Sequence, residues 1–496
     1  MKTLLIANRG EIAVRIIRAA REMGVRTVAV FSEADRHAMH VALADEAMFL
    51  GASEPSESYL NIGKVIQAAK EARADAVHPG YGFLSERAEF VEACDSNGLK
   101  FVGPSAAAMR ALGSKIDAKQ IAVQAGVPIT PGFFEKGATP KQLEVAATEI
   151  GYPVMLKASA GGGGRGMRIV RDPADFERER ELASDEAMKA FGDDAMMVEK
   201  YIERPRHIEV QILADSHGTV ACLFERECSL QRRHQKLVEE APSPVGEPIW
   251  NGLRESVDRL VRAAGYTGAG TAEFMFDQAS GQFYFLEVNA RLQVEHPVTE
   301  AITGLDLVQW QLRIADGEAL DLPRGLVAGD RSCIRGHSIE VRIVAEDPSK
   351  GFLPSIGKIL AWAEPKAPGI RVDTGFGPGS EVTRYYDSLI AKVIAHAESR
   401  GASIRRLEAA LLDFHILGIK TNIPYLIAIL RHPGFQAGDI DTGFLEREFG
   451  LWTGETEAPM ELGAIVDFAG TDSKGHDRHT VPVSGAWDAA DGFRVV

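Results

Sequence analysis

The sequence has few cysteines, no long apolar run and no excess of basic residues. Its 496 residues include four cysteines (Cys94, Cys222, Cys228 and Cys333), none of them in a C-x-x-C pair, so we predict reduced thiols instead of a disulfide framework. No apolar run approaches the roughly 18 residues of a membrane span, and the apolar start Met1–Ala7 is typical of a strand, not of a signal peptide. The 55 basic and 70 acidic residues give a net charge of −15, which argues against nucleic acid or a membrane as a partner. We therefore expect a cytoplasmic protein, or one of the mitochondrial matrix if a transit peptide has been removed.

Two common nucleotide-binding signatures are also missing. The turn after the first apolar strand reads Asn8-Arg9-Gly10-Glu11, with one glycine where a dinucleotide-binding turn needs three, which argues against NAD. Further along, the glycine run Gly161–Gly164 is not closed by Gly-Lys-[Ser/Thr], so it is not a P-loop. Any nucleotide must therefore be held in another way.

The sequence does contain a regular succession of strands and helices. In the first hundred residues, apolar strands such as Leu4–Ala7 and Val25–Phe31 alternate with amphipathic helices, which predicts a parallel, doubly wound sheet. From about residue 203 strands dominate, and helices are predicted over Leu253–Ala264, Leu305–Asp316 and Ile404–Leu417, which indicates an α+β body. A chain of this length is expected to form two to four packed units.

The glycine run is the strongest local signal. A strand that ends in Lys157 leads into five glycines within the six positions 161–166, and a second strand, Met167–Val170, follows. Glycine lets the backbone approach a ligand and donate several N–H groups to phosphate oxygens, and the lysine adds a positive charge. A flexible linker is the alternative, but linkers rarely lie between two apolar strands. We predict a phosphate-binding loop.

A pair of acidic strands is the second signal. Glu273 and Glu287 lie in two apolar segments that a turn at Ser280-Gly281 separates, so antiparallel pairing can place both carboxylates on one face. Such carboxylates are costly to bury unless they are paired or bound to metal. Mg²⁺ prefers oxygen ligands together with substrate phosphates, and Asn289 offers a third oxygen. We predict that Glu273, Glu287 and Asn289 hold Mg²⁺ or Mn²⁺.

These two signals, in this order, resemble the ATP-grasp superfamily. Four longer segments are similar to biotin carboxylase: residues 78–86 (HPGYGFLSE), 199–202 (EKYI), 231–236 (QRRHQK) and 289–300 (NARLQVEHPVTE). The resemblance runs from residue 2 to about 451. It implies an α/β and α+β chain with an ATP-grasp fold, comprising a doubly wound N-terminal domain (1–114), a linker and glycine-rich lid domain (115–202), a catalytic domain (203–330) and an α+β C-terminal domain (331–450). The tail 451–496 resembles the start of the linker domain of longer acyl-CoA carboxylase α-subunits.

In that family ATP phosphorylates bicarbonate to carboxyphosphate, which supplies CO₂ to the ureido nitrogen of biotin. By resemblance, the chain's ATP contacts are Lys115, Lys157, Gly161, Gly162, Gly163, Gly164, Met167, Glu199, Lys200, Ile202, His207, Gln231, His234, Lys236 and Met275. Lys236 is also expected to stabilise the transferred phosphoryl group.

The segment Arg291–Glu295 carries the bicarbonate chemistry in this resemblance. Arg291 presents a rigid fork of donors to the planar anion, and Gln293 and the Val294 backbone complete the pocket. Glu295 is the expected general base, and the neighbouring cation keeps it ionised. We expect Arg291, Gln293 and Glu295 to share one face of an extended segment.

Two further residues are expected at the biotin side. Arg342 matches the arginine that stabilises the ureido oxyanion of biotin. Tyr81, in a glycine-flanked turn, is expected either to approach biotin or to pack in the core.

The predicted partners are a biotin carboxyl carrier domain and a carboxyltransferase, and the sequence motifs of these two domains are not found here. The chain is expected to act as a homodimer or in a larger carboxylase complex. The resemblance implies that the complex carboxylates an acyl-CoA or, in the alternative of a pyruvate carboxylase, pyruvate, and the choice belongs to the carboxyltransferase. Other ATP-grasp ligases share the glycine lid but lack the Arg291-x-Gln293-Val294-Glu295 segment. A silent regulatory subunit would be expected to have lost Lys236, Glu287, Glu295 or Arg342, and all four are present.

Overall fold

The computed structural model describes residues 1–135, 137–159, 166–233, 235–450, 452 and 454. The chain divides into two compact units, Met1–Thr453 and Gly454–Val496. Almost all of the second unit, and with it the predicted tail from residue 451, lies outside the described residues. The account below concerns the first unit.

The N-terminal region is a five-stranded parallel sheet in the order β3-β2-β1-β4-β5. Its strands are β1 (Thr3–Ile6), β2 (Arg26–Ser32), β3 (Glu46–Gly51), β4 (Ala76–His78) and β5 (Lys100–Phe101). The helices between them are α1 (Gly10–Glu22), α2 (Met39–Leu43), α3 (Ile62–Glu71) and α4 (Ala88–Ser96). The predicted doubly wound sheet is confirmed, because its central strands are apolar and buried on both faces.

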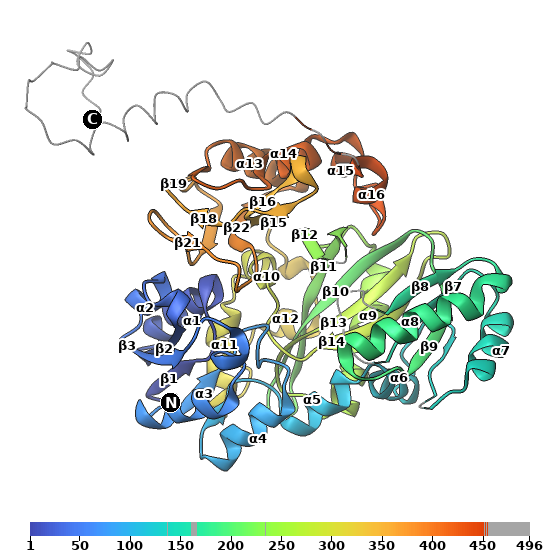
Figure 1. The fold of residues 1–496 in the computed structure, drawn as a ribbon, viewed down its shortest axis with the longest axis horizontal. Helices are drawn as coiled ribbons and strands as arrows, with labels where there is room; N and C mark the ends of the chain where they lie inside the picture. The colour runs from blue at the N-terminus through green and yellow to red at the C-terminus, as the bar shows by residue number, and fades with distance from the viewer. Residues whose placement is uncertain (136, 160–165, 234, 451, 453, 455–496) are drawn as a thin grey trace, which may run out of the picture. The chain divides into compact units, whose positions relative to one another are not determined.

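A small antiparallel sheet follows, in the order β6-β9-β7-β8. Its strands are β6 (Gly132–Phe133), β7 (Val154–Ala158), β8 (Met167–Val170) and β9 (Met196–Lys200). The helices α7 (Pro140–Ile150) and α8 (Phe176–Phe191) pack on it, and α5 (Ala106–Gly113) and α6 (Lys115–Gln124) precede it (Figure 1). Residues 160–165 of the predicted phosphate loop, between β7 and β8, lie outside the described residues.

An eight-stranded antiparallel sheet forms the body, in the order β14-β13-β10-β11-β12-β15-β22-β20. Its strands are β10 (Pro205–Ala214), β11 (Val220–Arg232), β12 (Gln235–Ala241), β13 (Gly268–Asp277), β14 (Gln282–Asn289), β15 (His337–Val344), β20 (Ile370–Thr374) and β22 (Leu389–Ala397). The sheet runs without a break across the predicted domain boundary near residue 331, because β12 pairs directly with β15.

The remaining helices cover this sheet or extend beyond it. They are α9 (Glu247–Ala263), α10 (His296–Thr303), α11 (Leu307–Ala315), α12 (Arg324–Ala328), α13 (Arg400–Leu412), α14 (Ile423–Arg431), α15 (Pro433–Ala437) and α16 (Phe444–Phe449). Short strands β16 (Glu346–Asp347), β17 (Leu353–Pro354), β18 (Gly357–Lys358), β19 (Ala361–Ala363), β21 (Glu381–Val382) and β23 (His415–Leu417) pair two by two. Among the described residues no helix has the length and apolarity needed to cross a membrane.

The predicted helix Ile404–Leu417 is wrong at its C-terminal end. Helix α13 ends at Leu412, and the apolar residues 415–417 form β23, which pairs with β19. Gly418, with φ +102°, follows directly, and a Cβ at this position would clash with the Lys358 carbonyl oxygen. The predicted helix is therefore two elements, the helix α13 and the short strand β23.

Candidate active site

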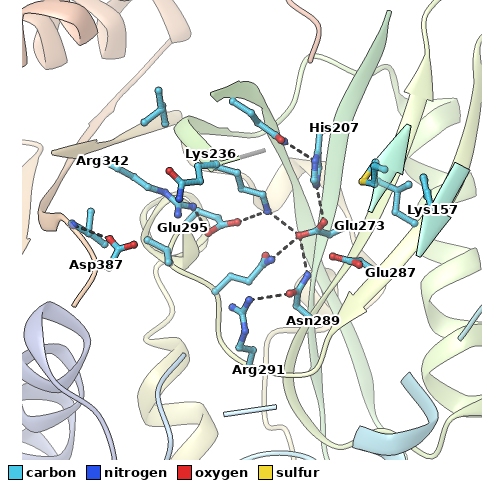
Figure 2. Close-up of a pocket in the computed structure, with 18 of the residues that line it drawn as sticks. Lys157, His207, Lys236, Glu273, Glu287, Asn289, Arg291, Glu295, Arg342 and Asp387 are labelled. Carbon is cyan, nitrogen blue, oxygen red and sulfur yellow. Dashed lines mark hydrogen bonds and ion pairs between the residues drawn. The ribbon is translucent and has the colours of Figure 1, made fainter. Parts of the chain in front are cut away.

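A cavity of about 410 Å³ is lined by both the four-stranded and the eight-stranded sheet (Figure 2). It brings together most of the predicted site residues: Lys157, Met167, Glu199, His207, Gln231, Lys236, Glu273, Glu287, Asn289, Arg291, Gln293, Val294, Glu295 and Arg342. Four others, Tyr81, Lys200, Ile202 and Met275, are not among the described residues that line it. Gly161–Gly164, His234 and the side chain of Lys115 lie outside what the structure describes.

Lys236, on β12, is the centre of the cavity's charge network. Its Nζ donates to Glu209 Oε2 at 2.5 Å, Glu273 Oε1 at 2.9 Å and Glu295 Oε1 at 2.7 Å (Figure 2). Burial disfavours the charged amine, but the three carboxylates outweigh burial and hold the pKa of Lys236 well above its usual value. One ammonium thus connects β10, β13 and the segment before α10.

Glu295 is buried and ionised. Burial alone would raise its pKa, but Lys236, Arg342 and Arg226 lower the pKa of this carboxyl well below its usual value. Arg342 Nη2 lies 3.0 Å from Glu295 Oε2, so each carboxylate oxygen has its own cation. A carboxylate that is ionised at neutral pH and faces a cavity has the right protonation state for a general base.

The local conformation around Glu295 differs from the prediction. Residues 291–295 form a loop and a turn, not an extended strand, and Glu295 precedes α10 with φ −81° and ψ 8°. Pro297 at the start of the helix favours this helical beginning. Arg291, Gln293 and Glu295 nevertheless all line the cavity, through the turn and not through strand alternation.

The predicted metal ligands lie on adjacent strands. Glu273 on β13 and Glu287 on β14 are direct cross-strand partners, and the predicted hairpin is confirmed. Asn289 donates from Nδ2 to Glu273 Oε1 at 2.9 Å, and its Oδ1 accepts from Arg291 Nη2 at 3.0 Å. Two carboxylates and an amide oxygen on one cavity wall are the hard oxygen ligands that Mg²⁺ prefers, so these residues fit that ion.

Sequence reasoning missed Lys119, which faces the same cavity from α6. Glu199 on β9 is 1% exposed and forms ion pairs with Lys119 and with Lys157 Nζ, the latter at 2.7 Å. Burial opposes ionisation, but the two lysines lower the pKa of Glu199 to about 2. Lys200, in contrast, donates to the Gly151 and Tyr152 carbonyl oxygens at 2.9 and 3.2 Å and so supports the start of β7.

Sequence reasoning also missed Arg226 on β11, which is fully buried. Its guanidinium donates to five side-chain oxygens: Glu209 Oε1 (2.5 Å), Gln211 Oε1 (2.6 Å), and Thr271 Oγ1, Thr299 Oγ1 and Gln293 Oε1 (each 3.0 Å). Gln293 then donates to Glu273 Oε1 at 2.8 Å. Charged residues inside the apolar strands β10 and β11 were the available signal, because a buried charge must be paired.

Arg342, on β15, is held by a second glutamate. Its Nε donates to Glu239 Oε1 at 2.6 Å. Burial raises the pKa of Glu239 to about 7 although Arg342 opposes this shift. Tyr81 is not among the described residues that line the cavity, and its hydroxyl donates to Glu11 Oε1.

Three family profiles match the chain in sequence order. They are the biotin carboxylase N-terminal domain over residues 1–109, the carbamoyl-phosphate synthase L chain ATP-binding domain over 114–322, and the biotin carboxylase C-terminal domain over 340–447.

Individual relatives are similar over the same region. Biotin carboxylase 1 of Bacillus subtilis is 47% identical over 447 residues, 90% of this chain and 98% of that protein. A pyruvate carboxylase subunit of Methanothermobacter thermautotrophicus is 47% identical, and the match covers 89% of both chains. The alpha subunit of the mitochondrial methylcrotonoyl-CoA carboxylase of Mus musculus is 48% identical over 444 residues, 89% of this chain, which spans only 61% of that protein's length.

A solved structure with the same fold is the biotin carboxylase domain dimer of the Hydrogenobacter thermophilus 2-oxoglutarate carboxylase, in complex with MgADP, ADP and bicarbonate. It superposes with a TM-score of 0.87 at 46% identity and covers 92% of this chain and 99% of that one.

Proposed function

The chain belongs to the biotin carboxylases of the ATP-grasp superfamily, and we propose that the described cavity carries out their reaction, the ATP-dependent carboxylation of biotin with bicarbonate. The observation that carries this proposal is the ionised Glu295 between Lys236 and Arg342. A base with two cations beside it, in a cavity that also offers lysines and oxygen ligands, suits an anionic substrate that must lose a proton and accept a phosphoryl group.

In the first step Arg291 and Gln293 bind bicarbonate, and Glu295 takes its hydroxyl proton. The freed oxygen attacks the γ-phosphorus of ATP, the bond to the β-phosphate oxygen breaks, and ADP and carboxyphosphate result. Lys157 and Lys236 neutralise phosphate charge. Bound Mg²⁺ would be held by Glu273, Glu287 and Asn289 and would supply further charge neutralisation.

In the second step the C–O bond of carboxyphosphate breaks, the carboxyl carbon bonds to the ureido N1′ of biotin, and the departing phosphate takes the N1′ proton. Arg342 stabilises the negative charge that develops on the ureido oxygen, and its pairing with Glu239 and Glu295 holds the guanidinium in place. Tyr81 donates to Glu11 and does not line the described cavity, so it has no direct role in this step.

The finer proposal is that the chain serves an acyl-CoA carboxylase as its biotin carboxylase part, in the cytoplasm or the mitochondrial matrix. The similarity to the mouse methylcrotonoyl-CoA carboxylase supports it, and the nearly equal similarity to a pyruvate carboxylase keeps that enzyme as the alternative. In either case the proposed partners are a biotin carboxyl carrier domain, a carboxyltransferase and a second copy of the chain. The proposed domain boundaries within this chain lie near residues 114, 202, 330 and 450.

The purified chain should hydrolyse ATP only when bicarbonate is present, and free biotin should accelerate this hydrolysis. The assay is phosphate release in bicarbonate-depleted buffer, with and without added bicarbonate and biotin, and chelation of divalent cations should abolish the activity. If neither bicarbonate nor biotin stimulated ATP hydrolysis, that result would contradict the assignment. Adding a biotinylated carrier and a carboxyltransferase then distinguishes an acyl-CoA from pyruvate as the acceptor.

Replacing Lys236 with glutamine should move the acid limb of the pH–turnover profile to higher pH. Lys236 is the first of the cations that depress the pKa of Glu295, so its loss raises that pKa and Glu295 becomes protonated at a higher pH as the pH falls. The measurement is kcat for bicarbonate-dependent ATP hydrolysis from neutral pH down past the usual pKa of a glutamate, because the wild-type acid limb lies below that pKa. Lys119→Gln is the matched control, because the described ion pair of Lys119 is with Glu199 and not with Glu295. The acid limb of the Lys119→Gln profile should therefore stay at the wild-type pH.

A further inference from the structure

Lys392 is a fully buried lysine to which the reaction described above gives no role. It lies on β22, where its direct cross-strand partners are Arg342 on β15 and Asp373 on β20. Directly paired residues point to the same face of a sheet, so Lys392 lies beside Arg342 under the loop before α10. Its Nζ donates to the Val294 carbonyl oxygen at 2.8 Å.

This hydrogen bond fixes the peptide plane immediately before Glu295. The Val294 carbonyl and the Glu295 amide belong to one planar peptide group, so a donor bound to the carbonyl sets the direction in which Glu295 leaves the turn. Distant strands also hold the side chains of this segment, but the other bonds described to its backbone carbonyls are local: Arg291 donates to Leu292, His296 to Gln293 and the Val298 amide to Glu295. Lys392 fixes the turn from a different part of the chain.

The lysine is charged, which makes the bond a strong one. Its Nζ lies 3.3 Å from Glu11 Oε1 and 3.7 Å from Asp373 Oδ2. Burial opposes the charged form, but Glu11, Glu340 and Asp373 together raise the pKa of Lys392. Hydrogen bonds from an ammonium are about twice as strong as those between neutral groups.

Glu11 extends the connection to the N-terminal region. The same Oε1 atom accepts the Tyr81 hydroxyl, so Tyr81, Glu11, Lys392 and the Val294 carbonyl form one chain of contacts. Helix α1 reaches this place because Gly375, just after β20, has no side chain, and a Cβ there would lie 2.5 Å from the Gly10 carbonyl carbon and 2.8 Å from the Glu11 amide nitrogen.

We propose that Lys392 is a positioning residue for bicarbonate activation, which holds the Arg291–Glu295 segment through the Val294 carbonyl and joins it to the N-terminal region through Glu11. This inference rests on the proposed function, because the segment that Lys392 holds is the proposed bicarbonate site. The competing explanation is that Lys392 only neutralises buried carboxylates and stabilises the sheet.

Kinetics of Lys392→Met distinguish the two explanations. The variant keeps the length of the side chain and removes its donor, so we expect kcat/KM for bicarbonate to fall about 10- to 100-fold, as loss of one charged hydrogen bond implies, while the Kd for ATP stays near that of the wild type. Arg400→Met is the matched control: Arg400, at the start of α13, pairs through Nε at 2.6 Å with the buried Glu240 of the same sheet, and neither residue is among the described residues that line the cavity. It should lower the melting temperature without changing kcat/KM for bicarbonate.

The double variant Lys392→Met with Glu11→Gln separates stability from position. Removing the carboxylate that Lys392 leaves uncompensated should restore much of the melting temperature, but kcat/KM for bicarbonate should stay low because the Val294 carbonyl still has no donor. Recovery of both together would overturn the proposal.

Hydrogen–deuterium exchange tests the same point without any activity. Amides of residues 294–296 should exchange faster in Lys392→Met and in the double variant than in Arg400→Met, and equal exchange in all three would also overturn the proposal. A wild-type chain without bicarbonate-dependent hydrolysis would instead contradict the proposed function, and the exchange result would still stand.

Discussion

Replacing Glu295 with glutamine is expected to lower the turnover of bicarbonate-dependent ATP hydrolysis by about 10²- to 10⁴-fold, the usual contribution of a general base. Glutamine has nearly the same shape but cannot accept the proton of bicarbonate. Because the base acts after the nucleotide has bound, the Kd for ATP should change little. Steady-state kinetics and equilibrium binding of ATP measure the two quantities separately.

Glu227→Gln is a suitable control for this experiment. Glu227 is as buried as Glu295, but it pairs with Arg206 and is not among the described residues that line the cavity. Its turnover should remain close to that of the wild type. If Glu295→Gln lost ATP affinity and turnover in equal proportion, Glu295 would have a structural role and the assignment of the base would fail.

Replacing Arg226 with methionine is expected to lower the free energy of unfolding by about 3–5 kcal/mol, the cost of removing one partner from a buried ion pair. The five oxygens would lose the donor that Arg226 supplies, and Glu209 would keep Lys236 at 2.5 Å and the more distant His207 Nε2 at 3.9 Å. Urea unfolding followed by circular dichroism measures the loss. Gln293 would also lose the donor to its Oε1, so bicarbonate affinity should fall in the same variant.

Arg331→Met provides the comparison for Arg226. Arg331 is one-quarter exposed and pairs with the buried Glu225, whose pKa burial raises to about 7. Glu225 can take up a proton when its partner is lost, so the loss of stability should be clearly smaller. A loss as large as that of Arg226→Met would show that the hydrogen-bond network around Arg226 adds little.

The sequence alone predicted those features that depend on local pattern. Apolar strands alternating with helices indicated the parallel N-terminal sheet, and two acidic strands around a Ser-Gly turn indicated the hairpin in which Glu273 and Glu287 face each other. The biotin carboxylase resemblance supplied most of the residues that the structure gathers around one cavity.

Features that depend on strand order and on distant pairing were not predictable in this way. Arg226 and Glu209 meet only because β10 and β11 pair in one register, and Lys392 meets Val294 because the start of α10 packs against β15 and β22. No spacing along the chain encodes these neighbours. The turn at Glu295 is different, because Pro297 signals a helix start and could have warned against an extended segment.

The continuous eight-stranded sheet has a consequence for how this enzyme can be divided. A cut near residue 331 would leave β12 and β15 as unprotected edge strands, each with a row of unpaired backbone groups that invite aggregation. It would also separate Lys236 on one strand from Arg342 on the other. Two different family profiles match the ATP-binding and C-terminal regions. The two regions nevertheless share one sheet, so they should be kept together in any excision, domain exchange or fusion.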